Sequence, residues 1–175
     1  MVLSFITLLF NSYQLLYSAV ALNGLFVITW IISIFKQDVS IDQHIWGLGF
    51  AIQALIYYLE SPQLTWQKTL FTFLVLFHTL RLTTYIFIRE YKQPEDRRYQ
   101  LLLRDKLGNH LTYLSLFIVF IPQMVFNWIV GLSLFSFEVS KNVNNISNLT
   151  FLFGCFIMMM GTLIESLADI QLYNF

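Results

Sequence analysis

The sequence predicts an all-α fold, a multi-pass transmembrane helical bundle of about five spans in a single integral membrane domain over residues 1–175. Composition is the first reason, because 57% of the residues are hydrophobic and 11% are charged, against about 25% charged in an average soluble protein. The second reason is the positive mean hydropathy of the chain, +0.66. The third reason is arrangement: the apolar residues come in runs of about 20, the length that crosses a hydrocarbon core of about 30 Å.

Four polar interruptions divide the chain into the predicted spans. The first 35 residues are too long for one upright span and too short for two, so we expect a short interfacial segment before the first span. Asp42 opens the second span, where a carboxylate can accept helix N-terminal N–H groups. Gly47 and Gly49 allow a neighbouring helix to approach closely. Pro122 removes a backbone hydrogen bond and is expected to bend the fourth span. The predicted spans are residues 17–35, 41–59, 66–88, 109–134 and 149–168.

Basic residues are divided unevenly between the two predicted sides of the membrane. Lys36 and the charged loop 89–108 together contribute seven lysines and arginines to one side, whereas Lys68 and Lys141 fall on the other. Because loops on the cytoplasmic side are enriched in such residues, the charged loop is expected on the cytoplasmic side, or on the matrix side. In a eukaryote the predicted location is therefore the endoplasmic reticulum or the mitochondrial inner membrane.

Composition also disfavours several classes of function. The formal net charge is zero, so there is no broad basic field for nucleic acid and we predict no nucleic-acid binding. The single cysteine, Cys155, and the three histidines lack the spacing of metal ligands, so we predict no metal site. The N-terminus has no basic region and no arginine, which disfavours a signal or transit peptide and favours a part of the membrane domain.

Charged residues concentrate directly after the third span, where residues 89–108 hold ten of the twenty in the chain. Arg81, inside that span, is unfavourable in lipid unless it faces protein, water or a ligand, so it marks a functional hypothesis. Glu165 and Asp169 lie four residues apart near the end of the last span, on one helical face. Ionisable residues of four separate segments are thus expected to meet at one end of the bundle. A charged cofactor could enter there from water, and a lipid-like substrate from the membrane.

The same residues also have a structural interpretation. Arg81 would then form an ion pair with Glu165 or Asp169 that joins two helices. The charges of residues 95–98 would form a solvated loop, and His78 would be a hydrogen-bonded interior histidine rather than a proton donor. The sequence alone leaves both interpretations open.

Four fragments of the sequence resemble the steroid 5-alpha-reductase-like family of integral membrane proteins. They are VSIDQHIWGLGF (39–50), RLTTYIFIRE (81–90), PEDRRYQLLL (94–103) and IESLADIQLYNF (164–175). The resemblance implies a helical membrane fold, of the kind also found in isoprenylcysteine methyltransferases, in which NADPH delivers hydride to a carbon–carbon double bond of a steroid- or enone-like lipid. It further implies that these residues lie near the cofactor: Arg81, Glu95, Asp96, Arg98, Tyr99, Glu165 and Asp169.

The resemblance covers only part of the family's pattern. Family members continue into a C-terminal region with an arginine and a His-Pro-Asn-Tyr-like motif, whereas this sequence stops at Phe175 and has no such motif. It also has no GxGxxG, so NADPH is not expected to bind in a Rossmann-type site. We therefore expect catalysis to need a complementing C-terminal chain or further sequence, and we assign no catalytic residue.

The alternative hypothesis is a non-catalytic structural subunit of a larger membrane complex, derived from the reductase fold. Its partners would be membrane lipids and other membrane subunits. Methyl transfer is a third hypothesis, which the sequence supports less because the methyltransferases' cofactor motif also lies in the missing region.

Overall fold

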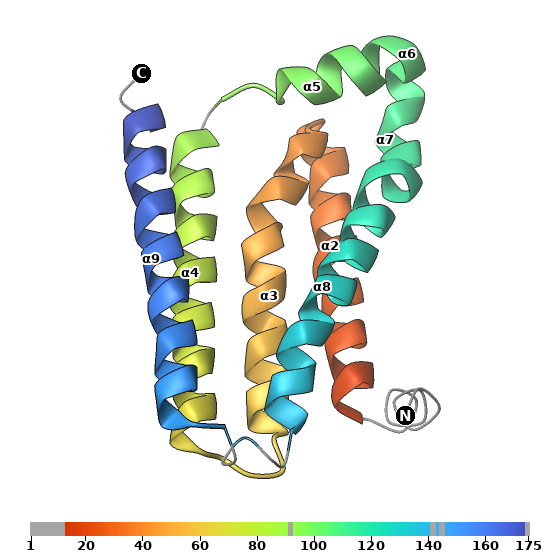
Figure 1. The fold of residues 1–175 in the computed structure, drawn as a ribbon. Helices are drawn as coiled ribbons and strands as arrows, with labels where there is room; N and C mark the ends of the chain where they lie inside the picture. Colours follow the sequence, from red (N-terminus) through yellow and green to blue (C-terminus); the bar gives the residue numbers. More distant parts are fainter. Residues whose placement is uncertain (1–12, 91–92, 141–142, 144–145, 174–175) are drawn as a thin grey trace.

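The protein is a bundle of long helices joined by short connections, as a computed structural model shows for residues 13–90, 93–140, 143 and 146–173 (Figure 1). No strand occurs among these described residues, and the predicted all-α membrane bundle is confirmed. The long helices are α2 (Tyr13–Lys36), α3 (Asp42–Leu59), α4 (Trp66–Glu90), α8 (Ile121–Val139) and α9 (Asn148–Tyr173). Three short helices lie between α4 and α8, namely α5 (Arg97–Tyr99), α6 (Asp105–Leu107) and α7 (Leu111–Ser115).

Four helical stretches of the described chain are long and apolar enough to cross a membrane: Tyr13–Lys36, Trp66–Glu90, Tyr113–Val139 and Asn148–Tyr173. Each overlaps one predicted span, although α2 begins earlier than residue 17 and α8 ends later than residue 134. The interfacial segment predicted before α2 falls mainly on residues 1–12, outside the described residues. The other predicted span corresponds to α3, which is enclosed by α2, α4 and α8.

The long helices alternate in direction along the chain. In Figure 1, α2, α4 and α9 run toward the end where α5 lies, and α3 and α8 run back. We call the end near α5 end A and the opposite end, where α4 and α9 begin, end B. The charged segment 93–110 therefore lies at end A, together with the last turns of α2, α4 and α9 and the first turn of α3. This arrangement brings the predicted site segments to one end of the bundle.

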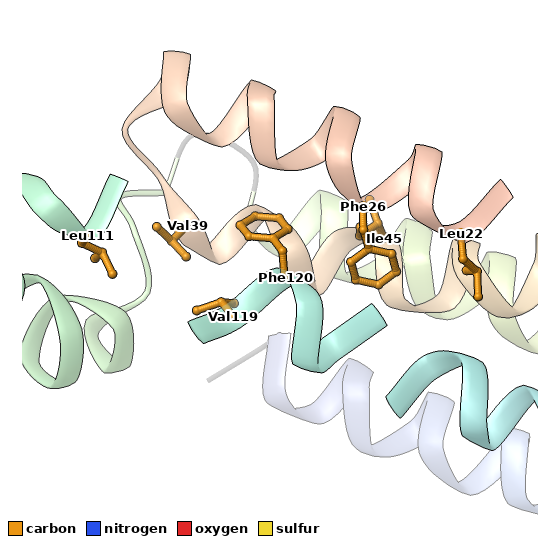
Figure 2. Close-up of a cluster of buried hydrophobic side chains, with 7 residues drawn as sticks. All are labelled: Leu22, Phe26, Val39, Ile45, Leu111, Val119 and Phe120. Atoms are coloured by element: carbon orange, nitrogen blue, oxygen red, sulfur yellow. The ribbon is translucent and has the colours of Figure 1, made fainter. Parts of the chain in front are cut away.

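Apolar packing beneath end A fixes the relative positions of these segments. Figure 2 shows side chains from α2, the turn Val39–Ile41, α3 and the stretch before α8 meeting in one buried cluster, formed by Leu22, Phe26, Val39, Ile45, Leu111, Val119 and Phe120. Tyr99, Leu103 and Leu107 pack against this cluster from the charged segment. The segment is thus held to the bundle by its own apolar side chains.

Glycines allow α3 to lie close to its neighbours, as the sequence predicts. A Cβ atom added at Gly47 would lie 2.7 Å from the Thr79 carbonyl oxygen on α4. One added at Gly49 would lie 2.7 Å from Asn127 Oδ1 on α8. Because real Cβ atoms do not approach so closely, a larger residue at Gly47 would push α3 away from the α4 backbone, and one at Gly49 would displace the Asn127 side chain.

The predicted charged loop 89–108 is mostly helical, so that prediction is wrong in its local structure. Helix α4 continues to Glu90, and helical structure resumes at Arg97 and runs, with π-helical turns at Gln100–Arg104, through α6. Asp96 caps the new helix, since its side chain accepts a hydrogen bond from the Arg98 N–H. The apolar face that packs against the core then favours helix over an extended solvated loop.

The fourth long helical stretch departs from regular geometry just before its proline. Residues Leu116–Phe120 form a π-helical turn, and Pro122 follows in the first turn of α8. A proline cannot donate to the helical ladder, and a π-helical turn is one way in which a helix adapts to such a break. The irregularity that the sequence predicts thus begins before Pro122 rather than at it.

End B is closed by a group of polar side chains that we call the lysine cluster, formed by the buried Lys68, Thr72 and Glu138 and the partly buried Ser61. The Lys68 ammonium donates to Ser61 Oγ at 2.7 Å and to the Glu138 carbonyl oxygen, and Thr72 Oγ1 donates to Glu138 Oε1 at 2.9 Å. Lys68 is 0% and Glu138 1% exposed. These contacts tie α4, the turn before it and the end of α8 together.

Candidate functional site

Arg81 lies between α4 and α9 and is held by both predicted acidic partners. Its Nη2 lies 2.8 Å from Glu165 Oε1, and its Nη1 lies 2.5 Å from Asp169 Oδ2. The side chains of Arg81 and Asp169 are 19% exposed and that of Glu165 is 36% exposed. An arginine nine residues before the end of α4 lies about 13 Å below it along the helix axis. The two carboxylates compensate its charge at that depth.

His78 extends this group by one helical turn toward end B. Its Nδ1 lies 3.6 Å from Glu165 Oε2 and 3.3 Å from Thr162 Oγ1. The Thr162 hydroxyl donates to the Met158 carbonyl oxygen at 3.0 Å, so its lone pairs can accept from His78. We call His78, Arg81, Glu165 and Asp169 the arginine cluster.

A second group, the loop cluster, joins the charged segment to the first turn of α3. The Tyr99 hydroxyl donates to Asp42 Oδ1 at 3.0 Å, and the Val39 N–H donates to Glu95 Oε1 at 2.9 Å. Asp42 lies in the first turn of α3 but is not its cap, because Ile41 occupies the capping position. The loop cluster therefore consists of Asp42, Glu95, Asp96, Arg98 and Tyr99.

Charge pairing and burial shift the pKa values of three residues in the loop cluster, Asp96, Arg98 and Tyr99. Asp96 and Arg98 form an ion pair of 2.7 Å, and the guanidinium of Arg98 holds the pKa of the Asp96 carboxyl well below its usual range. The same pair raises the pKa of Arg98. Burial, reinforced by the nearby Asp42 carboxylate, raises the pKa of the Tyr99 hydroxyl, which therefore remains a proton donor over the physiological range.

A chain of polar contacts runs along the end-A half of α4 from the arginine cluster to His44 and Glu90, which line one small pocket with Asp96 of the loop cluster. His44 Nε2 on α3 lies 3.4 Å from Glu90 Oε2, and Glu90 Oε1 lies 3.0 Å from Arg89 Nη2. The Arg89 guanidinium lies over the Tyr85 ring, 5.7 Å from its centre, and the Tyr85 hydroxyl donates to the Asp169 carbonyl oxygen at 3.1 Å. The site thus continues from the water-exposed segment 93–99 down to Arg81.

An apolar groove of about 300 Å³ runs between α4 and α9 beside the arginine cluster. Its lining residues are Phe73, Leu74, Phe77, Met158, Met159, Thr162, Leu163 and Ser166. Thr162 belongs to the groove and also contacts His78, so the groove and the polar cluster are in direct contact. The site therefore combines an apolar slot with ionisable groups, an arrangement common in small-molecule sites.

The structure divides the predicted cofactor residues between these two clusters. Arg81, Glu165 and Asp169 meet directly, and Glu95, Asp96, Arg98 and Tyr99 meet around the start of α3. The sequence analysis missed four further residues of the site, His44, Tyr85, Glu90 and Thr162. Helical spacing offered a signal for two of them, because Tyr85 follows Arg81 by four residues and Thr162 precedes Glu165 by three.

Comparison with known proteins gives one result on the family. A family model described as "Protein of unknown function (DUF1295)" matches residues 29–175, which include every residue of both clusters. The chain belongs to the DUF1295 family. No curated protein and no solved structure matches this DUF1295 protein.

Within the described ranges, no group of three or more His, Cys, Asp or Glu side chains is arranged to hold a metal ion. The carboxylates of the arginine cluster are instead paired with Arg81, and Asp96 is paired with Arg98. These paired side chains offer a ligand hydrogen bonds and opposite charges.

Proposed function

We propose that this DUF1295 protein is the membrane-embedded part of an NADPH-dependent reductase that acts on a carbon–carbon double bond of a lipid-like enone, as its resemblance to the steroid 5-alpha-reductase-like family suggests. The observation that carries the proposal is the arginine cluster with its extension to the loop cluster. Ionisable side chains in an apolar bundle are unfavourable and mark functional sites by default. Here they form one continuous path from the aqueous end to an apolar groove.

The side chains at end A fit one portion of a dinucleotide. Carboxylates such as Glu165 and Asp96 suit ribose hydroxyl groups, which donate hydrogen bonds to them. The paired arginines, Arg81 and Arg98, orient these carboxylates and balance their charge. The nicotinamide and its ribose are therefore the portion of NADPH that we assign to this chain.

In such a reaction NADPH, when bound, supplies the hydride. The chain's own residues would do three things. Arg81 would hold Glu165 and Asp169 in fixed positions, so that little reorganisation is needed when a ligand binds. The apolar walls of the groove would exclude water from the reacting carbon atoms. The loop cluster would close the aqueous end of the site.

The test measures NADPH binding to the purified protein in lipid nanodiscs through the change in the cofactor's fluorescence. Arg81→Ala is expected to weaken binding by about 10- to 100-fold, because hydrogen bonds to charged groups contribute about 1.5–3 kcal/mol. Lys36→Ala is the matched control, since it removes one exposed positive charge from the same end and lies outside both clusters. Unchanged binding in Arg81→Ala would remove Arg81 from the cofactor site, and no binding by the wild-type chain would count against the reductase proposal.

A structural subunit of a membrane complex is the second candidate function. The observation that favours it is that Arg81 is bound by two carboxylates of its own chain, which is sufficient for a purely helix-joining role. This candidate predicts that mild detergent extracts the protein only in complex with other membrane subunits. A stable, solitary monomer after extraction would contradict it, and native mass spectrometry of the extracted protein distinguishes the two results.

A further inference from the structure

We infer that the outer face of α2, around Asn23, binds a second copy of this chain, so that the DUF1295 protein forms a parallel dimer in the membrane. The inference goes beyond the proposed function and does not rest on it. Three observations support it. They are an amide exposed at the middle of the bilayer, a buried indole N–H beside it that lacks an acceptor within the described chain, and a row of exposed side chains on α2 with the spacing of a helix-pairing seam.

Asn23 exposes its amide at a depth where the bilayer offers no partner. It lies ten residues after the start of α2 at Tyr13 and thirteen before its end at Lys36, or about 15 Å and about 20 Å along the helix axis. Water and lipid headgroups are therefore out of reach in a hydrocarbon core of about 30 Å. Asn23 Nδ2 donates to the Ala19 carbonyl oxygen of its own helix at 2.8 Å, whereas no described group donates to Asn23 Oδ1. An unpaired amide oxygen in hydrocarbon is unfavourable, so a protein partner is expected on this face.

A small hollow beside Asn23 contains a second unpaired group. The hollow has a volume of about 170 Å³ and lies between the neighbouring helices α2 and α8 (Figure 1), lined by Ala19, Leu22, Asn23, Met124, Val125 and Trp128. The Trp128 indole N–H is buried, and none of the described residues accepts a hydrogen bond from it. Small-molecule sites have volumes of about 300–1,000 Å³, so this hollow suits one side chain of a protein partner better than a lipid or a cofactor.

The outer face of α2 has the spacing of a helix-pairing seam. Leu16, Val20, Asn23 and Val27 follow one another at intervals of four, three and four residues, and all four side chains are exposed. Two parallel helices pack at these intervals in a left-handed coiled coil, in which each seam residue lies opposite its own copy. Gly24 is next to this row, and a Cβ atom added there would meet nothing within 4 Å, so a second helix can approach closely.

These features favour a second copy of the chain over another protein. Copies of a membrane protein share one orientation, so a two-fold dimer has its axis along the membrane normal and brings both Asn23 side chains to the same depth. Each amide donates and accepts, so two copies of Asn23 satisfy each other, and an asparagine pair also fixes the register of paired helices. The Trp128 N–H lies at the same level and can donate to Asn23 of the partner subunit. One symmetric contact thus pairs all the unpaired groups.

The outer face of α9 is a less suitable candidate for the interface. It also has glycines at which an added Cβ would meet nothing within 4 Å, Gly154 and Gly161. The polar side chains near them are already bonded, since Thr162 donates to its own helix and Glu165 is paired with Arg81. A dimer through α9 would leave Asn23 and Trp128 unpaired. Helix α9 therefore provides the controls.

The first experiment is disulfide cross-linking of the full-length chain in phosphatidylcholine liposomes without NADPH. Val20→Cys should form a covalent dimer when copper phenanthroline is added. Phe156→Cys is the matched control, because Phe156 is similarly exposed at a similar depth on α9, and it should not be cross-linked. The native Cys155 is buried and is present in both variants. Absence of the covalent dimer in Val20→Cys, or equal amounts in both variants, would overturn the inference.

The second experiment measures the dimer fraction by energy transfer between full-length chains that carry a donor or an acceptor fluorescent protein, as the protein-to-lipid ratio is lowered. Gly24→Leu should weaken dimerisation about tenfold, because a leucine side chain separates the two α2 helices. Gly154→Leu is the matched control, since both glycines have open space around the added Cβ and neither change disturbs packing within one chain. An unchanged dimer in Gly24→Leu, or an equal loss in Gly154→Leu, would contradict the assignment.

The same assay tests the polar contacts. Asn23→Leu should weaken dimerisation about tenfold, whereas Thr84→Leu, which removes an exposed polar side chain from α4, should not. Trp128→Phe removes the indole N–H but keeps an aromatic ring, and should weaken the dimer less. Because Trp128 donates to Asn23 of the partner subunit, the variant with both changes should be no weaker than Asn23→Leu alone. An unchanged dimer in Asn23→Leu, or effects that multiply in the double variant, would overturn this contact.

Discussion

The arginine cluster near end A and the lysine cluster at end B are built from similar groups in opposite settings. Each holds a basic side chain of α4 against acidic or carbonyl oxygens of another helix. The lysine cluster is sealed, with Lys68 0% and Glu138 1% exposed. The arginine cluster is partly open, with Glu165 36% exposed, and it borders an apolar groove. A sealed cluster can only hold helices together, whereas an open one can also receive a ligand.

The largest effect is expected at the lysine cluster. Lys68→Met would leave the Glu138 carbonyl oxygen and Ser61 Oγ without their charged donor and the buried Glu138 carboxyl without a nearby cation, and hydrogen bonds to charged groups contribute about 1.5–3 kcal/mol each. Lys68→Met with Glu138→Gln removes both charges and should restore the part of this stability that comes from charge. Thermal unfolding in detergent measures both variants. A double variant as unstable as the single one would show that charge is not what makes this cluster important.

A smaller effect is expected at the arginine cluster. Arg81→Met should destabilise the fold by about 1–2 kcal/mol, since the side chains of Glu165 and Asp169 are only partly buried. The same unfolding measurement applies, with the neutral variant Arg81→Met, Glu165→Gln, Asp169→Asn as control. If Arg81→Met destabilises as strongly as Lys68→Met, the contrast between an open and a sealed cluster is wrong.

The smallest effect is expected at the exposed edge of the loop cluster. Asp96→Asn keeps the helix cap but removes the ion pair with Arg98, which at this exposure is worth less than about 1 kcal/mol. The folded-state pKa of Asp96 lies below the unfolded value of about 3.9. The ion pair with Arg98 therefore stabilises the fold fully at a pH above the unfolded-state pKa of Asp96. This contribution disappears as the pH falls through the folded-state pKa of Asp96. Unfolding curves from pH 7 downward should converge for the two proteins; parallel curves would contradict the shift.

The sequence predicted the arginine cluster because its geometry follows from membrane topology. A span fixes the depth of Arg81, and a spacing of four residues puts Glu165 and Asp169 on one face of the last helix. Once α4 and α9 run in the same direction, these residues meet at one level. Helix periodicity and depth were sufficient for this part of the site.

The loop and lysine clusters could not be predicted in the same way. The contact of Tyr99 with Asp42 depends on segment 93–99 folding back over α3, which neither hydropathy nor charge encodes. Lys68 and Glu138 lie near the ends of predicted spans, where the sequence indicates solvated interfacial side chains. Their burial comes from the packing of α4, α8 and the turn at Ser61, a tertiary effect.

The central claim is that the arginine cluster is a ligand site and the lysine cluster a structural one. The direct test is thermal unfolding in nanodiscs with and without NADPH, since a ligand that binds the native state stabilises it by about 2.7 kcal/mol at a hundred times Kd. NADPH should raise the Tm of the wild-type chain and of Lys68→Met with Glu138→Gln. It should leave the Tm of the neutral arginine-cluster variant unchanged. A shift retained in that variant, or absent from the wild-type chain, would contradict the account.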